Sequence, residues 1–267
     1  MSLSAVLFLF LVHLGVGVTL VLAWVKREAG VKFFRFNAGT AALLIGFGFA
    51  LRPEPDVPST LHTAATAALV IAEAALVVYW ATIGRALASI RPLVLWSAIA
   101  GGLVAVVLQA LEISGEAPGL MPLVTVASFL SSVALLGGAC GAMVLGHWYL
   151  VVPSLNVAHL QSIVRLHIGS TVVRVVVVAT AVLLAIWTWQ PGLPSFERYI
   201  FSIDGIFFWQ RVAFGLAGPA VLSYLTWETA KIQSTQSATG ILYVDFFTVI
   251  VGEVLAKYLL LSTKVPV

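Results

Sequence analysis

The sequence predicts an all-α protein, a polytopic integral membrane helix bundle with about eight transmembrane helices. Three observations predict this fold class. The mean hydropathy is +1.07, and 61% of the residues are hydrophobic. Charged residues make up only 9% of the chain, whereas they account for about a quarter of a soluble domain. Long apolar runs fill the 267 residues almost end to end, so we expect a single transmembrane domain over residues 1–267.

Four apolar runs in the first half of the chain are each long enough to cross a bilayer as a helix. They are Leu3–Val25, Phe33–Leu51, His62–Ile83 and Leu93–Leu111. The first run is too long for a signal-peptide core, follows no basic residue and lacks an Ala-x-Ala-like cleavage site, so we expect it to remain as a span. Proline and charge interrupt the later runs, at Arg52-Pro53-Glu54-Pro55 and at Arg91-Pro92.

The second half of the chain contains four more expected spans. They are Leu120–Val152, Gln161–Trp189, Gly205–Trp227 and Gly240–Ser262. Glu116-Ala117-Pro118-Gly119, Pro153 and Gln190-Pro191-Gly192 separate them. Pro219 predicts a kink inside the third of these spans. The small residues of Gly137–Gly141 predict close approach of neighbouring helices.

Lys and Arg are distributed unevenly between the connecting loops, which predicts the orientation. Alternate loops contain Lys26, Arg27, Lys32 and Arg35, then Arg85 and Arg91, then Lys231. The other loops contain only Arg52 and Arg198, each beside acidic residues. Because cytoplasmic loops carry the excess of basic residues, both termini are predicted on the outer face. The expected location is the bacterial inner (cytoplasmic) membrane.

Several function classes are disfavoured by composition. A net charge of +3 without basic runs argues against a nucleic-acid partner. The single cysteine, Cys140, permits neither a disulfide framework nor covalent attachment of c-type haem. We find no Asp-rich magnesium motif, no His-x-x-x-His cluster and no Ser/His/Asp arrangement. We therefore assign no catalytic residues, and a subunit of an oxidoreductase complex is a better prediction than a stand-alone enzyme.

One group of polar residues lies around the turn between the fifth and sixth spans. His147 and His167 each lie about 9 Å inside the predicted boundary on adjacent antiparallel helices. Two imidazoles at one depth favour three alternatives: iron ligands of a b-type haem, hydrogen-bonding groups beside a quinone, or purely structural histidines. Arg165 and Asp245 lie near the same boundary. These four residues are the candidate cofactor-binding residues, and the two histidines are metal ligands only if haem is bound.

A second group lies near the predicted midplane and contains His13, Glu73, Arg174 and Glu253. Arg174 follows His167 by seven residues, so both lie on one face of the helix. Ionisable residues at this depth normally need a partner or a water-filled cavity, and they mark pathways or sites. We predict proton transfer through this group. The alternative is a buried polar network, such as a Glu73–Arg174 ion pair, that only fixes helix packing.

Two basic residues receive structural explanations at this point. Lys257 follows Glu253 by one helical turn, which is typical of an ordinary pair within one helix. Arg211 lies near the predicted outer boundary, where a long basic side chain reaches the interface.

The eight-span plan, the scattered intramembrane acids and arginines, and the dipeptide Gly252-Glu253 give a family resemblance. The chain resembles the quinol-interacting membrane anchors of the polysulfide reductase and DMSO reductase type. The resemblance covers the overall architecture and this one dipeptide. It implies quinol binding without haem, electron transfer to an iron–sulfur subunit, and a role for Glu253.

From the sequence we therefore predict a membrane-embedded subunit of a respiratory or electron-transfer complex. It is expected to interact with quinone (menaquinone or ubiquinone), or with haem b, and to couple proton transfer. The expected partners are the lipid bilayer and other subunits of the complex. The alternatives are a transporter or channel with a polar intramembrane path, and a non-catalytic assembly subunit.

Overall fold

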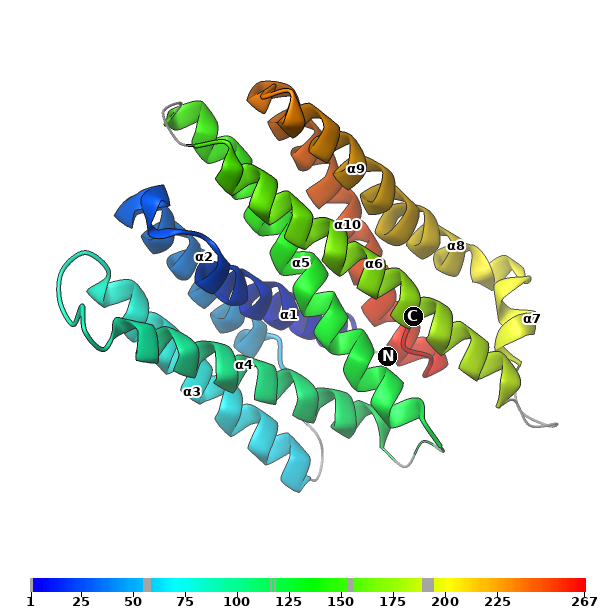
Figure 1. The fold of residues 1–267 in the computed structure, drawn as a ribbon. Helices are drawn as coiled ribbons and strands as arrows, with labels where there is room; N and C mark the ends of the chain where they lie inside the picture. The colour runs from blue at the N-terminus through cyan, green and yellow to red at the C-terminus, as the bar shows by residue number, and fades with distance from the viewer. Residues whose placement is uncertain (1, 55–58, 116, 118, 153–155, 189–194) are drawn as a thin grey trace.

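A computed structural model describes residues 2–54, 59–115, 117, 119–152, 156–188 and 195–267. All regular structure within these residues is helical (Figure 1). The elements are α1 (Leu3–Trp24), η1 (Arg27–Ala29), α2 (Gly30–Ala50), α3 (Thr60–Thr82), α4 (Arg91–Ser114), α5 (Met121–Val151), α6 (Ala158–Trp187), α7 (Phe196–Ile200), η2 (Ile203–Gly205), α8 (Ile206–Val212), η3 (Ala213–Ala217), α9 (Gly218–Lys231) and α10 (Thr235–Thr263). The all-α prediction is confirmed for the described part of the chain.

Seven helical segments of the described residues are long and apolar enough to cross a membrane, and they suggest an integral membrane protein. These segments are α1, η1 with α2, α3, α4, α5, α6, and α8 with η3 and α9. The eighth expected span corresponds to α10, a 29-residue helix that is not among the seven. This helix contains Asp245, Glu253 and Lys257.

Helix starts follow local chemistry in the sequence. The Ser59 hydroxyl accepts a hydrogen bond from the His62 N–H at 3.0 Å and so caps α3. Pro92 and Pro122 lie in the first turns of α4 and α5, where a proline needs no N–H partner. These signals, together with apolar runs of 20 residues or more, explain why the predicted spans and the observed helices agree closely.

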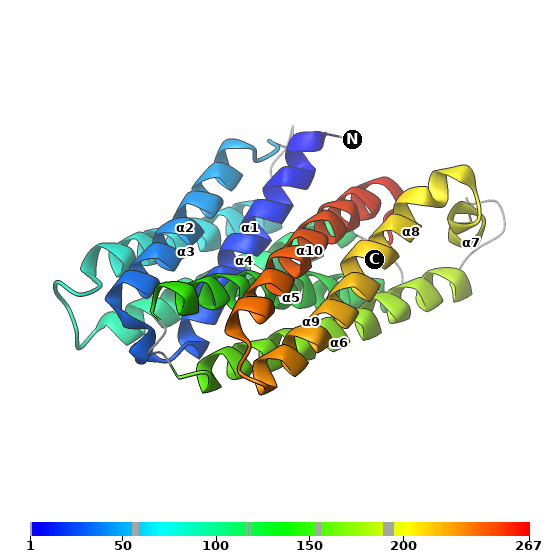
Figure 2. The same cartoon turned by 90° about the horizontal axis from the view of Figure 1, so that it is seen from above.

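The helix α1 lies at the centre of the bundle, where it packs against α2, α4, α5 and α10 (Figures 1 and 2). Within the most apolar window, 78% of α1 is buried, against 28% for α3 and for α6. The helices α3 and α4 pack against each other at one side, and α9 and α10 do so at the other. An interior between α1, α5, α6 and α10 is therefore shielded from the surroundings.

Small residues let the central helices touch through their backbones. A Cβ atom added at Gly17 would collide with the backbone of Gly137 on α5. One turn further along α5, a Cβ atom at Gly141 would collide with Val21 of α1. The Gly137–Gly141 stretch thus packs closely, as predicted.

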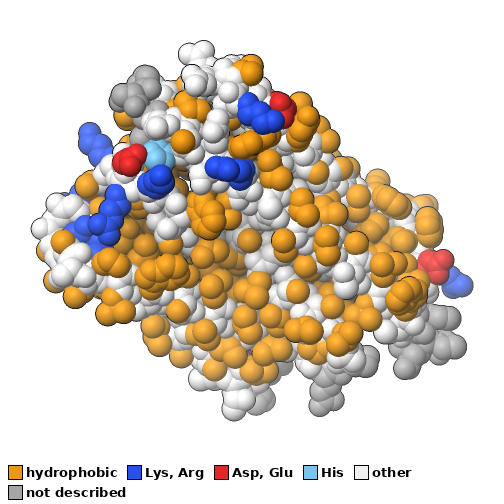
Figure 3. Space-filling model, viewed as in Figure 1, with side chains coloured by type: hydrophobic (Ala, Val, Ile, Leu, Met, Phe, Trp, Pro, Cys, Tyr) orange, Lys and Arg blue, Asp and Glu red, His pale blue; other side chains and the backbone are white. Residues whose placement is uncertain are grey.

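The outer surface is apolar along the sides of the helices. On the face shown in Figure 3, hydrophobic side chains cover the middle, while charged side chains gather towards the ends. Leu43, Phe47, Val172 and Val176 are between 57% and 63% exposed. This distribution is typical of a surface in contact with lipid, because lipid chains cover apolar side chains at little cost in free energy.

Both ends of the described chain lie at one end of the bundle (Figure 1). Ala5 of α1 and Leu261 of α10 line the same cavity there, together with Arg52 and His62. The charge distribution in the loops assigns this end to the outer face, which stays a prediction.

The segment α8–η3–α9 contains a break in regular helix. Residues Ala213–Ala217 form a π-helical turn, immediately before Gly218 and Pro219. Proline cannot donate a backbone hydrogen bond and its ring crowds the carbonyl four residues earlier, and a π turn accommodates such a fault. The structure thus has a π turn directly N-terminal to Pro219, where the sequence predicts a kink.

Candidate functional site

Three serines on α5 point into the shielded interior. Ser128, Ser131 and Ser132 are spaced so that they share one face of the helix, and all three are buried. These serines are not among the site residues predicted from the sequence. Their spacing within an otherwise apolar run was the available signal.

Glu253 of α10 is the centre of a buried ionic cluster. Its side chain is 0% exposed. Arg174 of α6 donates to both of its carboxylate oxygens, from Nε at 2.9 Å and from Nη2 at 3.2 Å. Arg211 Nη2 donates at 2.9 Å, Lys257 Nζ at 3.4 Å, and the Ser132 hydroxyl at 2.5 Å. One carboxylate therefore joins α5, α6, α8 and α10.

Arg174 also links α6 to α5 through hydrogen bonds. Its Nη1 donates to the Ser128 carbonyl at 3.0 Å, to the Ser128 hydroxyl at 2.7 Å and to the Ser131 hydroxyl at 3.3 Å. Its Nη2 also lies 3.4 Å from the Val267 carbonyl oxygen. A fully buried guanidinium thus has a dense set of acceptors, as its desolvation requires. The Glu73–Arg174 ion pair considered from sequence is not formed, because Arg174 pairs with Glu253.

His13 of α1 extends the cluster towards the centre of the bundle. Its Nδ1 lies 3.2 Å from the Ser132 hydroxyl, and its ring meets the edge of the Phe129 ring at 4.6 Å between centroids. Lys257 Nζ donates to the same serine hydroxyl at 2.7 Å. The Nε2 atom of His13 is buried without a partner among the described residues.

Arg211 occupies a place that the sequence analysis did not predict. We expected it to reach the outer interface, but the structure buries it completely and pairs it with Glu253. The side chain lies against Gly215, whose backbone contacts that of Gly252 on α10. Only glycine fits at these two positions. A Cβ at Gly215 would collide with the Arg211 guanidinium, and a Cβ at Gly252 would collide with the Gly215 backbone. Arg211 Nε and Nη1 find no partner among the described residues.

The cluster contains more positive than negative charge. Three cationic side chains, from Arg174, Arg211 and Lys257, contact a single carboxylate. Burying charge is expensive unless it is paired and hydrogen-bonded. The surplus of positive charge therefore favours a bound anion or a change of protonation within the group.

A second buried pair lies between α6 and α10. His167 Nε2 lies 2.6 Å from Asp245 Oδ2, and both side chains are 0% exposed. Their other polar atoms, His167 Nδ1 and Asp245 Oδ1, are buried without a partner among the described residues. Gly138 of α5 faces the ring, since a Cβ there would lie 3.4 Å from His167 Nδ1.

The His167–Asp245 pair and the Glu253 cluster follow one another along the bundle. Asp245 and Glu253 are eight residues apart on α10, about 12 Å along the helix axis. Buried hydroxyls lie between them on both helices: Thr248 lies between Asp245 and Glu253 on α10, and Ser170 and Thr171 lie between His167 and Arg174 on α6. We call this set the polar column; its members are His13, Ser132, His167, Ser170, Thr171, Arg174, Arg211, Asp245, Thr248, Glu253 and Lys257.

His147 and Arg165 do not join the polar column. His147 is exposed, and its Nδ1 lies 2.8 Å from the Tyr243 hydroxyl. Arg165 is exposed and lies over the Trp227 ring at 5.6 Å. The expectation that His147 and His167 face each other is not met, because His147 contacts Tyr243 while His167 contacts the buried Asp245. These residues do not fit a haem held between the two histidines.

Glu73 also lies apart, in a lateral groove between α2 and α3. The groove has a volume of about 500 Å³, and its lining includes Gly39, Gly46, Phe47 and Trp80. The carboxylate is only partly shielded, yet its Oε2 atom is buried and lacks a partner among the described residues. The four midplane residues therefore do not form one group: His13, Arg174 and Glu253 converge, and Glu73 faces the α2–α3 groove.

Two histidine–carboxylate pairs near the helix ends were not predicted. His62 Nδ1 lies 2.9 Å from Glu112 Oε1, joining α3 to α4. His159 Nε2 lies 2.6 Å from Glu28 Oε2, joining α6 to η1. Both pairs connect segments far apart in sequence, so neither has a local sequence signal.

Comparisons with models of known protein families and with curated proteins found no match. The description of the chain therefore depends on its own residues. Within the described residues the regular structure is helical, seven apolar helices suggest a membrane location, and the interior contains a buried column of ionisable and hydroxyl side chains.

Proposed function

We propose that this chain is the membrane-embedded, quinone-interacting subunit of an electron-transfer complex, and that its interior transfers protons. The polar column is the single observation that carries the proposal. It places two acids, two histidines and three cationic side chains in the most shielded part of an apolar bundle. Ionisable residues inside membrane proteins are costly and mark pathways for ions or protons.

Direct contact between the side chains favours protons over larger cargo. Ser132 lies within 2.5 to 3.2 Å of polar atoms of His13, Glu253 and Lys257. A proton can pass along such hydrogen bonds by rearrangement of donors and acceptors. A solute would require space that these contacts fill.

The groove beside Glu73 suits a quinone headgroup. Its walls are mainly apolar and it opens sideways between α2 and α3, towards the expected lipid, from which a long-chain quinone enters. The Glu73 carboxylate has no hydrogen-bond partner among the described residues and can accept a hydrogen bond from a quinol hydroxyl. Oxidation of a quinol releases two protons and two electrons; the electrons would pass to a redox group of a partner subunit, which the family resemblance implies is an iron–sulfur subunit.

Quinone binding is tested with the purified protein in nanodiscs. Short-chain ubiquinone and menaquinone analogues are titrated while the tryptophan fluorescence, including that of Trp80, is followed. Glu73→Gln should weaken binding about tenfold, because a hydrogen bond to a charged group contributes about 1.5–3 kcal/mol. Glu112→Gln, a carboxylate already paired with His62, is the matched control. Equal affinity in all three proteins, or no binding, would refute the quinone site.

The proton-transfer part is tested separately in the complex as extracted from its membrane. Asp245→Asn should slow quinol turnover while the affinity for quinone stays the same, because Asp245 does not line the Glu73 groove. Unchanged turnover would count against a proton path through the polar column.

A second candidate function follows from the surplus positive charge around Glu253. Arg211 Nε and Nη1, which find no partner in the part of the chain that the structure describes, and the excess of two positive charges favour an anion in transit through the column. Uptake of small anions by proteoliposomes, lost in Arg211→Gln, would support transport in place of redox function. The absence of such uptake would leave the redox proposal.

A further inference from the structure

A cavity of about 340 Å³ lies between the ends of four helices, and no residue of the polar column lines it. The helix α1 ends beside it at Trp24, α2 begins at Gly30, α3 ends at Thr82 and α4 begins at Arg91. The cavity therefore lies at one end of the bundle, in the region that meets the membrane surface. Exposed tryptophans on two of these helices, Trp24 and Trp96, are typical of an interfacial position.

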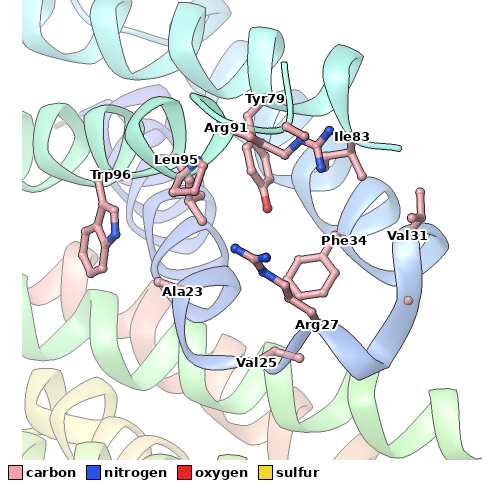
Figure 4. A pocket seen from close by; sticks show the side chains of 13 residues that line it. Ala23, Val25, Arg27, Val31, Phe34, Tyr79, Ile83, Arg91, Leu95 and Trp96 are labelled. Carbon is pink, nitrogen blue, oxygen red and sulfur yellow. The ribbon is translucent and has the colours of Figure 1, made fainter. Parts of the chain in front are cut away.

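Two guanidiniums and one hydroxyl supply the polar lining. In Figure 4, the Arg27 side chain and the Tyr79 hydroxyl point into the space from opposite sides, and Arg91 forms the wall beside Tyr79. Arg27 and the Tyr79 hydroxyl make no side-chain hydrogen bond to a described residue. Arg91 Nη2 donates to the carbonyls of Thr82 and Ala86, at 3.2 and 2.8 Å, while its Nε is buried with no partner in the described part of the chain.

No acidic side chain lies among the described residues that line this cavity. The nearest acid in sequence, Glu28, is paired with His159, and neither residue lines the cavity. The two arginines are therefore not neutralised by the protein where they face the cavity. Their donors match the geometry of an anion with several oxygen acceptors.

The rest of the cavity wall is apolar. Val25, Phe34, Ile83 and Leu95 line it around the polar groups, and Trp96 lies at its side (Figure 4). An inorganic anion would leave these side chains uncovered. A molecule with an anionic head and a hydrocarbon body would satisfy both parts.

From this arrangement we propose that the cavity binds the phosphate headgroup of an anionic phospholipid. Arg27 and Arg91 hold the phosphate, the Tyr79 hydroxyl donates to one of its oxygens, and the start of the acyl chains covers the apolar wall. Basic pockets between transmembrane helices bind such headgroups by the same means. The site is independent of the proposed redox function, because it shares no residue with the polar column or the Glu73 groove.

The test measures phosphatidylglycerol binding to the detergent-purified protein by native mass spectrometry and by the rise in Tm on adding lipid. The double variant Arg27→Gln/Arg91→Gln should bind at least about tenfold more weakly, because each guanidinium contributes a charge-assisted hydrogen bond. Lys32→Gln/Arg35→Gln is the matched control, since it removes the same charge from the same end of the bundle outside the cavity lining. The control should bind as the unmutated protein does.

Three results would overturn the proposal. Equal loss in the two double variants would mean that general surface charge attracts the lipid. An equal rise in Tm with inorganic phosphate at the same concentration would mean that a soluble phosphate compound is the ligand. If Arg27→Gln/Arg91→Gln does not fold, competition between phosphatidylglycerol and phosphatidylcholine for the unmutated protein provides the test. The variant Tyr79→Phe then measures the contribution of the hydroxyl. Equal binding of the two lipids by the unmutated protein would refute the site.

Discussion

Two glutamates near the middle of their helices, Glu253 and Glu73, have opposite environments. Glu253 on α10 is 0% exposed and contacts Arg174, Arg211, Lys257 and Ser132. Glu73 on α3 is partly exposed in a lateral groove, and its Oε2 atom lacks a partner among the described residues. The difference shows that a carboxylate in this bundle is fully buried where neighbouring helices supply cationic and hydroxyl partners, and stays partly exposed where they do not.

The two environments also differ in what they offer chemically. The Glu253 carboxylate is saturated by its neighbours, so it suits a structural or proton-relay role inside the bundle. The Glu73 side chain lines an open groove and has no hydrogen-bond partner among the described residues, so it suits a ligand that arrives from outside. Substitutions that break the first environment should therefore affect folding, and those at the second should affect binding.

The largest effect is expected for Glu253→Gln. It leaves Arg174, Arg211 and Lys257 buried without a compensating charge, and breaking one partner of a buried ionic group costs about 3–5 kcal/mol. Thermal unfolding in detergent measures this loss. A decrease in stability no larger than that of Glu73→Gln would contradict the distinction between the two glutamates.

A smaller loss is expected for Asp245→Asn. The substitution removes the charge that accepts the His167 hydrogen bond at 2.6 Å, and hydrogen bonds to charged groups contribute about 1.5–3 kcal/mol. Unfolding of the variant checks the magnitude. His147→Ala is the comparison, because that exposed histidine contacts only Tyr243 among the interactions described, and it should be nearly neutral. Similar losses of stability in both variants would mean that the buried His167–Asp245 pair stabilises the protein no more than the exposed His147 does.

Gly252→Ala should cost about 1–3 kcal/mol, the range for overpacking in a close-packed interior. Its Cβ would collide with the Gly215 backbone and displace the path by which Arg211 reaches Glu253. Gly240→Ala on the same helix is the control, because a Cβ there meets nothing within 4 Å. If both variants unfold at the same temperature, the contact between Gly215 and Gly252 does not support the cluster.

The smallest effect on stability, less than about 0.5 kcal/mol, is expected for Glu73→Gln, since partly exposed sites without partners tolerate substitution. Chemical labelling compares the access to the two glutamates. A hydrophobic carbodiimide should label Glu73 in the unmutated protein and leave the buried Glu253 unlabelled, and peptide mass spectrometry measures both. Labelling of Glu253 instead would reverse the comparison.

Much of the fold could be predicted from sequence because long apolar runs and local breakers act locally. The runs Leu3–Val25 and Leu120–Val152 correspond to α1 and α5, and the Gly137–Gly141 stretch packs closely as its composition suggests. The location of His13, Arg174 and Glu253 at a common depth could also be predicted, since depth depends only on position along a helix.

The partners of these residues could not be predicted. Arg211 was assigned to the interface because it lies near a span end, yet the π turn and the Gly215–Gly252 contact bring it to Glu253. His147 shares a depth with His167 but faces outward to Tyr243. Equal depth says nothing about the direction in which a side chain points.

The sequence by itself determined that the chain forms apolar helices and that acids, bases and imidazoles lie within them. Only the tertiary structure decided that Arg174, Arg211 and Lys257 share one carboxylate while Glu73 is left to the surface. The physical reason is that helix formation and depth depend on neighbouring residues and on solvent preference. The rotation and contacts of each helix depend on packing against segments far away in the chain.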